Sequence, residues 1–190
     1  MPGYEVAAKL EKLGWHASDT GELSFTDVEV PEENLLGEEN EGFKLIMFNF
    51  AWERLLMAIG AVGAMQRLIE ITVAYANERE AFGRPIGKFQ AIRHHVAEMA
   101  TLAETSRALT YNGLRLFHEG QDCIQEVSMA KLLTQRALLE IADQSLQIHG
   151  GYGYMREYDV ERALRDARLG PIGGGTDEIM KEIVGKQLGL

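Results

Sequence analysis

The pattern of hydrophobic and polar positions separates a β-like N-terminal segment from a longer helical region. In the N-terminal segment, Ser24, Asp27 and Glu29 partly alternate with apolar residues, which are Leu23, Phe25, Val28 and Val30. This alternation predicts one or two short strands, preceded by a turn at residues 18–21 and ended by a proline. Because an isolated strand pair is marginal in water, we expect the segment to dock against other structure.

The longest apolar stretch, Gly42 to Asn77, predicts a central helix. Its part from Leu45 to Met65 contains only three strongly polar residues, Asn49, Glu53 and Arg54. A stretch of this length is too long for a strand and too apolar for a surface helix, which indicates a buried helix. A membrane span is the alternative, but each charge at its middle would cost about 2.5–3.5 kcal/mol on insertion. We therefore expect no membrane span.

The remaining sequence predicts four more helices, separated by glycine-rich loops. Helical spacing of apolar and small residues predicts helices over Phe89–Glu119 and Asp122–Ile148. The seam of the first is Ile92, Val96, Met99, Ala103, Ser106, Thr110, Gly113 and Phe117, and that of the second is Val127, Ala130, Ala137, Ile141 and Ser145. A short helix is expected over Asp159–Arg168 and a last one from Thr176. The predicted fold is all-α, an antiparallel four-helix-type bundle with a short β-rich N-terminal remnant.

Charge and composition exclude several classes of function. A net charge of −10 without a Lys/Arg cluster argues against nucleic-acid binding, which needs a basic face. The single cysteine, Cys123, excludes an internal disulfide and a cysteine-based zinc site. Since His94 and His95 are adjacent on a predicted helix, their side chains point apart, and no metal site is expected.

Glu53 is the candidate for chemistry on the central helix. At helical spacing it shares a face with apolar or small residues, namely Ile46, Asn49, Phe50, Met57, Gly60 and Ala64. Burial of a carboxylate without a partner raises its pKa towards the range of a general base. Arg54 projects about 100° away around the helix, so we do not expect it to neutralise Glu53 face to face. The alternative is a structural carboxylate, hydrogen-bonded across the bundle.

Several ordered motifs resemble one known family. The loop motifs are Glu78-Arg79-Glu80-Ala81-Phe82-Gly83-Arg84-Pro85-Ile86, Gln147-Ile148-His149-Gly150-Gly151-Tyr152-Gly153-Tyr154 and Gly173-Gly174-Gly175-Thr176-Asp177-Glu178-Ile179. Together they closely resemble the C-terminal part of the acyl-CoA dehydrogenase family. Three N-terminal stretches, Pro2–Glu5, Leu13–Thr20 and Val30–Gly37, are similar to the end of its middle β domain. The resemblance implies that residues 1–37 are the end of that domain and residues 38–190 a helical bundle domain, together roughly half of such an enzyme.

The resemblance also distinguishes two positions for a catalytic base. Many members carry the glutamate in a segment that corresponds here to residues 172–176, where Gly174 occupies the position. Long-chain and isovaleryl-CoA dehydrogenases place it in a Glu-Arg-Leu segment, which matches Glu53-Arg54-Leu55. The implied reaction is oxidation of a fatty acyl-CoA to the trans-2-enoyl-CoA, with proton abstraction by Glu53 and hydride transfer to FAD. The implied substrate contacts are Arg54 near the CoA moiety and the loop at Gly173 and Gly174, whose backbone N–H polarises the thioester carbonyl.

Cofactor contacts are implied at three places. In relatives the positions of Arg79, Phe82 and Gln90 contact the FAD of a neighbouring subunit. The segment with Gln147, Gly150 and Gly151 lies along the FAD phosphates and adenosine. Thr176 and Glu178 match contacts near the last helix. Each has a plainer alternative, such as a helix stop at the glycines or a helix cap at the threonine.

The resemblance implies partners and location as well. These are an acyl-CoA substrate, an electron-transfer flavoprotein as acceptor, and a homotetramer or dimer. The location is cytoplasmic in a bacterium and the mitochondrial matrix in a eukaryote. A non-catalytic helical oligomerisation module remains an alternative for the isolated chain, and an oxidase or flavin monooxygenase-like relative is a third interpretation.

Overall fold

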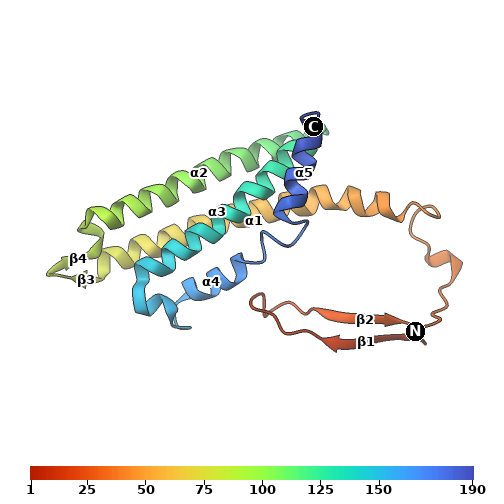
Figure 1. The fold of residues 1–190 in the computed structure, drawn as a ribbon, viewed down its shortest axis with the longest axis horizontal. Coiled ribbons are helices and arrows are strands. Elements are labelled where there is room, and N and C mark those ends of the chain that lie inside the picture. The colour runs from red at the N-terminus through yellow and green to blue at the C-terminus, as the bar shows by residue number, and fades with distance from the viewer. The chain divides into compact units, whose positions relative to one another are not determined.

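In the computed structural model, which describes residues 1–190, the chain forms two units, Met1–Phe50 and Ala51–Leu190 (Figure 1). The first unit contains an antiparallel pair of strands, β1 (Tyr4–Lys9) and β2 (Gly21–Phe25), followed by a short 3-10 helix, η1 (Glu32–Asn34). Tyr4 lies opposite Phe25, with ring centroids 5.4 Å apart.

The strand prediction is correct only in part. The observed β2 ends at Phe25, whereas the apolar alternation continues to Val30. Asp27 has a φ of 50°, a left-handed conformation that stops an extended strand. The first strand, β1, was missed because its alanines have a low preference for strands, and its conformation depends on pairing with β2.

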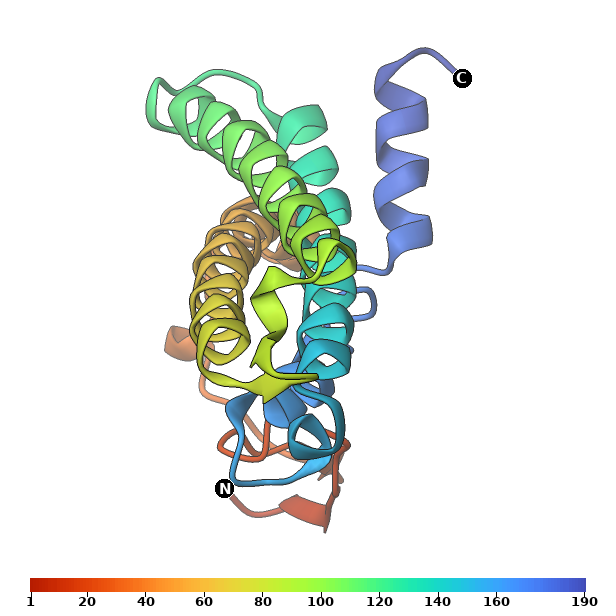
Figure 2. The same cartoon turned by 90° about the vertical axis from the view of Figure 1, so that its left-hand side faces the viewer.

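Three long helices and two short ones form the helical region. They are α1 (Gly42–Glu78), α2 (Gln90–His118), α3 (Ile124–His149), α4 (Asp159–Ala167) and α5 (Asp177–Gln187). Figures 1 and 2 show α2 running antiparallel to both α1 and α3. Each predicted boundary lies within two residues of the observed one, which confirms the predicted predominantly helical fold. The linking elements are two strands, β3 (Glu80–Ala81) and β4 (Arg84–Pro85), and two 3-10 helices, η2 (Ile86–Lys88) and η3 (Gly150–Tyr154).

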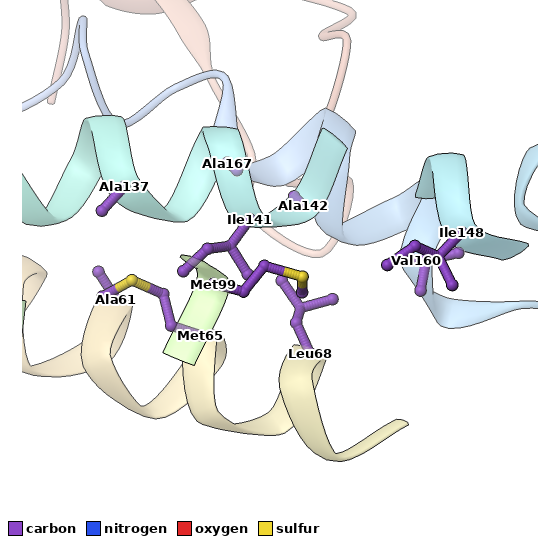
Figure 3. Packing of buried hydrophobic residues seen from close by; sticks show 10 residues of the cluster. All are labelled: Ala61, Met65, Leu68, Met99, Ala137, Ile141, Ala142, Ile148, Val160 and Ala167. Carbon is purple, nitrogen blue, oxygen red and sulfur yellow. The ribbon is translucent and has the colours of Figure 1, made fainter. Parts of the chain in front are cut away.

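The core of the helical unit lies where α1, α2, α3 and α4 meet (Figure 3). Met65, Met99 and Ile141 are fully buried there. Burial of such a side chain contributes about 1.5–3 kcal/mol relative to leaving it exposed. Ala61, Ala137, Ala142 and Ala167 are small residues of the same cluster, and they let the helices approach closely.

The buried stripe of α1 differs from the one expected for Glu53. It follows steps of three and four residues through Leu55, Ala58, Ala61, Met65, Leu68, Thr72 and Ala76. Glu53 lies beside this stripe and is half-buried, while its neighbour Arg54 is buried with 9% exposed. The expected burial of Glu53 is therefore only partial in this chain.

By length and apolar composition, α1 is also the one helix that could cross a membrane. However, its Ala61, Met65 and Leu68 pack in the core shared with α2, α3 and α4. Only 22% of the most apolar 18-residue window of α1 is buried in this chain. The prediction of a buried helix therefore holds for the part of α1 that packs in this core.

Candidate active site

The loop between α4 and α5 lies against the turn of α1 that carries Glu53. Gly174 in this loop has a φ of 65°, and a Cβ added to it would lie 2.6 Å from the Met57 sulfur. Met57 is one helical turn after Glu53 on the same face. The Arg54 Nε donates a hydrogen bond of 3.0 Å to the Gly174 carbonyl. The structure thus places Glu53, Arg54 and Gly174 in one neighbourhood.

The backbone N–H groups of this loop are used unequally. Gly173 N–H donates to the Leu169 carbonyl at 2.8 Å, as in a helical turn. Gly174 N–H makes no hydrogen bond within the chain. A donor in this state is available to a ligand oxygen, whereas the Gly173 donor is already engaged.

Arg54 sits in an electrostatically unusual position. Removal from water lowers the pKa of its guanidinium, and the negative charge of Glu53 raises it again. The charge of Glu53 thus acts on Arg54, although the two side chains leave the helix about 100° apart. The hydrogen bond from the Arg54 Nε to the loop backbone indicates a structural role for Arg54, beside the contact to CoA that the resemblance implies.

Two residues of α3 that the sequence analysis did not select complete this neighbourhood. The Nζ of Lys131, a residue with 0% exposed surface, donates to the Gly175 carbonyl at 2.5 Å. One helical turn later, the Nε2 of Gln135 donates to the Met57 carbonyl at 2.9 Å. Lys131 could have been found from its sequence position, since it follows Val127 by one turn on the predicted buried side of the helix.

A second group of predicted residues lines a cavity of about 610 Å³. Arg79, Gly150 and Gly151 form part of its wall, and the other lining residues are Tyr75, Ile86, Ile148, His149, Tyr152 and Met155. The Arg79 guanidinium lies 5.4 Å from the centre of the Tyr152 ring, within the range of a cation–π contact.

Aromatic contacts hold the backbone at this cavity. The Tyr75 ring stacks on His149 with centroids 4.2 Å apart, and its hydroxyl donates to the His149 carbonyl at 3.2 Å. The His149 Nδ1 lies 2.7 Å from the Ser145 carbonyl oxygen, and burial lowers the pKa of the imidazole. Neither Tyr75 nor His149 was predicted from the sequence as a site residue.

The glycines at this cavity leave space for a ligand. Gly150 has a φ of 61°, and nothing lies within 4 Å of a Cβ added at Gly150 or Gly151. An open backbone, a cation and aromatic rings suit an anionic ligand with an aromatic part. These residues therefore fit FAD.

Phe82 lies at the tip of the β3–β4 hairpin and is 94% exposed. Phe82 and Gly83 have φ values of 55° and 75°, the signs that a tight two-residue hairpin turn requires. A positive φ is unfavourable for a bulky residue, so an exposed phenylalanine there is a candidate for a functional role.

The other predicted cofactor residues lie outside the cavity. Gln90 and Gln147 are exposed on α2 and α3. Thr176 is the N-cap of α5, and its hydroxyl accepts from Ile179 N–H at 3.4 Å, as the plainer alternative predicts. Hydrogen bonds from its own N–H and from Thr176 lower the pKa of Glu178.

Comparison with known proteins identifies what the chain is similar to. Residues 40–189 match the family described as "Acyl-CoA dehydrogenase, C-terminal domain". Over 187 residues the chain is 45% identical to an acyl-CoA dehydrogenase of Bacillus subtilis (strain 168), a match covering 98% of this chain and 49% of the relative. It is 42% identical to a mitochondrial isovaleryl-CoA dehydrogenase of Oryza sativa subsp. japonica, covering 99% of this chain and 46% of the relative.

A solved structure gives the same match in three dimensions. The crystal structure of a probable acyl-CoA dehydrogenase from Mycobacterium abscessus has a TM-score of 0.96 and 45% identity, covering 98% of this chain and 50% of that one. The chain thus spans about half the length of the relatives that it matches.

Proposed function

Because this chain belongs to the acyl-CoA dehydrogenase family, we propose that it supplies the catalytic base and part of the flavin site for oxidation of a fatty acyl-CoA. The product would be the trans-2-enoyl-CoA. The observation that carries this proposal is the position of Gly174, with an unengaged N–H, against the turn of α1 that follows Glu53. The base would then act on the α-carbon, and the N–H donor on the carbonyl oxygen, of one thioester.

In the proposed reaction, Glu53 removes the proton from the α-carbon. Negative charge then develops on the thioester oxygen, and the Gly174 N–H donates a hydrogen bond to it. FAD, when bound, accepts the hydride that leaves the β-carbon. Gly173 and Gly174 carry no side chain that would fill the space of the substrate, which leaves room for a base that arrives from α1.

We propose that the FAD contacts are divided between the cavity and the exposed hairpin. Members of this family bind FAD. Gly150 and Gly151 would receive the phosphates and adenosine along their open backbone, and Arg79 would offer a positive charge. Exposed Phe82 and Gln90 would contact the FAD of a neighbouring subunit, which requires an oligomer. Gln147, Thr176 and Glu178 complete the proposed set.

We propose that Arg54 has two roles, which are to hold the loop through its bond to the Gly174 carbonyl and to provide positive charge near the CoA moiety. The chain is 41% identical to a long-chain acyl-CoA dehydrogenase and 42% identical to an isovaleryl-CoA dehydrogenase. These similar values support the subgroup with its base on the first helix of this domain, but they do not favour one acyl group.

The wider assembly is proposed on the same family basis. Residues 1–37 would be the end of a middle β domain, residues 38–190 the helical bundle domain, and the assembly a tetramer or dimer. One structural neighbour comes from work on the electron transferring flavoprotein of Acidaminococcus fermentans, which supports an acceptor of this kind. Eukaryotic relatives are named as mitochondrial and bacterial relatives exist, so a mitochondrial matrix or a bacterial cytoplasm is proposed accordingly.

A non-catalytic oligomerisation module is the second candidate. The observation that favours it is that this chain covers 49% of its Bacillus subtilis relative, so it carries only part of that protein's cofactor environment.

The visible absorption spectrum of the purified chain, with its intact mass, distinguishes the two candidates. The spectrum is recorded before and after addition of FAD and a fatty acyl-CoA. A flavin spectrum that bleaches with the acyl-CoA supports catalysis by this chain. A colourless oligomer that does not retain FAD supports the module.

A further inference from the structure

Lys131 is the most deeply buried cation of the chain and has no part in the reaction described above. It has 0% exposed surface, and its Nζ lies 2.5 Å from the Gly175 carbonyl oxygen. A buried lysine is rare unless it is paired, because removal of the ammonium from water is unfavourable. The contact to a backbone carbonyl therefore calls for an explanation.

The loop that Lys131 contacts has its ends joined by one backbone hydrogen bond, from the Asp177 N–H to the Pro171 carbonyl at 3.1 Å. Gly174 and Gly175 have φ values of 65° and 97°, and neither N–H makes a hydrogen bond within the chain. Glycines also lose more conformational freedom on ordering than other residues. Between the bonds of Gly173 and Asp177, no backbone N–H of the loop donates to a backbone carbonyl.

The two carbonyls between these points are held by cationic side chains. Arg54 donates to Gly174 O from α1, and Lys131 donates to Gly175 O from α3. Charge-assisted hydrogen bonds are roughly twice as strong as neutral ones. The pair therefore adds a charged contact to each of two successive peptide groups in the middle of this loop, where the backbone bonds itself least.

Acidic residues of α5 keep Lys131 compatible with this position. Burial lowers the pKa of the Lys131 ammonium, the charges of Asp177 and Glu178 raise it, and Arg54 lowers it. Asp177 is itself paired with Arg136 at 2.6 Å. The start of α5 thus supplies negative charge on the side of the loop where the lysine is buried.

We propose that Lys131 is a positioning residue, which holds the Gly173–Gly175 loop so that the Gly174 N–H keeps the orientation needed to receive the thioester oxygen. The substrate part of this inference rests on the function proposed above, whereas the ordering of the loop does not. Lys131 would contact neither substrate nor flavin. Its bond is to the peptide group between Gly175 and Thr176, so it would act on the Gly174 N–H through the intervening loop backbone.

The first arm of the test measures loop order in the whole chain without FAD. Amide ¹⁵N order parameters of Gly174 and Gly175 are compared in the wild type, Lys131→Met, Lys131→Gln and the control Lys186→Met. Lys186 is an exposed lysine in the same helical unit, paired with Glu182. We expect order parameters of about 0.85 in the wild type and control and below about 0.6 in Lys131→Met.

Lys131→Gln keeps a hydrogen-bond donor without the charge, so we expect order parameters between those of the wild type and Lys131→Met. This variant also decides the question if Lys131→Met does not fold, and wild-type order in Lys131→Gln would then overturn the proposal. A rigid loop in folded Lys131→Met would overturn it as well.

The second arm measures how strongly the thioester carbonyl is polarised on binding. An acyl-CoA labelled with ¹³C at the carbonyl is added to the FAD-loaded chain, and the shift of the carbonyl resonance on binding is measured. We expect a downfield shift in the wild type and Lys186→Met and its loss in Lys131→Met. An equal shift in Lys131→Met would overturn the positioning role. If the wild type shows no shift, the proposed function fails, while the order parameters still decide whether Lys131 orders the loop.

Discussion

Gln135 on α3 donates a hydrogen bond of 2.9 Å to the carbonyl of Met57 on α1, and this bond connects two helices at the turn that follows Glu53. The side chain of Gln135 is 5% exposed. A Cβ added to Gly170 would lie 2.3 Å from the Gln135 Oε1, so the glycine makes room for this amide. The position of Glu53 relative to the loop therefore depends on a polar contact between α1 and α3.

Replacement of Gln135 by Met removes this hydrogen bond at nearly constant volume. We expect the free energy of unfolding to fall by about 0.5–1.5 kcal/mol, the usual net value of one hydrogen bond. Urea denaturation followed by circular dichroism measures the change. The control is Gln66→Met, which removes an exposed contact to Glu70 and should change stability by less than about 0.5 kcal/mol. Equal effects of the two variants would contradict the role of Gln135.

Gly174→Ala tests whether the loop requires a glycine. The alanine Cβ would meet the Met57 sulfur at 2.6 Å, and a φ of 65° is unfavourable for a residue with a side chain. We expect a loss of about 1–3 kcal/mol in the free energy of unfolding.

Gly63→Ala is the matched control for that substitution. Gly63 lies inside α1, has an ordinary φ, and no atom lies within 4 Å of its added Cβ. Alanine at this position should stabilise the chain by about 0.5–1 kcal/mol. A stabilising Gly174→Ala, measured by urea denaturation, would show that the loop conformation has been misassigned.

The helices could be predicted from the sequence because their signals are local. Glycines at Gly120 and Gly150 end two helices with positive φ values, and Thr176 caps the last one. The buried face of α1 could not be predicted in the same way. Since apolar residues occur on every side of this helix near Glu53, periodicity alone did not identify the stripe through Leu55 and Ala58.

The site was predicted best where a motif is contiguous. Gly150 and Gly151 are adjacent in sequence and face the same cavity as Arg79. Tyr75 was missed because its bond to the His149 carbonyl joins positions 74 residues apart. Lys131 was missed for the same reason, as its acceptor lies 44 residues later and is a backbone carbonyl without a sequence signature.

His149 should make stability depend on pH. Burial lowers its pKa in the folded chain, so the unfolded chain binds the proton more readily below the ordinary value of about 6.5. The stabilising contribution is therefore present above this value and is lost as the pH falls through the folded pKa. For one histidine, the free energy of unfolding changes by at most about 1.4 kcal/mol per pH unit.

Urea denaturation at pH 7, 6 and 5 measures this slope. His149→Phe, which keeps a ring to stack on Tyr75, should show a smaller loss between pH 7 and 5 than the wild type. His94→Phe removes an exposed histidine of α2 and should keep the wild-type slope. The assignment is wrong if His94→Phe, and not His149→Phe, flattens the profile.

Phe82 should contribute to cofactor retention and not to the fold. Its positive φ suits glycine better, whereas its ring contacts Phe89 edge-on with centroids 6.1 Å apart. Because these effects oppose each other, Phe82→Gly should change the free energy of unfolding by less than about 1 kcal/mol. The same substitution should reduce the flavin retained on gel filtration, since the proposed contact with FAD of a neighbouring subunit is lost. Phe82→Tyr keeps the ring and should retain flavin as the wild type does. Full retention in Phe82→Gly would remove Phe82 from the FAD site.

Glu53→Gln separates the proposed base from a structural carboxylate. The amide has nearly the same shape, so a structural role predicts a change in stability, whereas a base predicts a loss of chemistry with FAD still bound. Positioned general bases contribute about 10²–10⁴ to a rate, and we expect a loss of that size in flavin bleaching by acyl-CoA. Exchange of the α-proton with deuterated solvent should be lost together with bleaching, because both need the same proton transfer.

Glu70→Gln is the control for this experiment, because it makes the same substitution at an exposed position of the same helix. It should bleach and exchange at the wild-type rate. The FAD absorbance of Glu53→Gln must match that of the wild type before substrate is added, so that a loss of rate is not a loss of cofactor. Unimpaired bleaching in this flavin-loaded variant would exclude Glu53 as the base. Since Gly174 has no side chain to replace it, the base would then have to come from outside the junction of α1 with the Gly173–Gly175 loop.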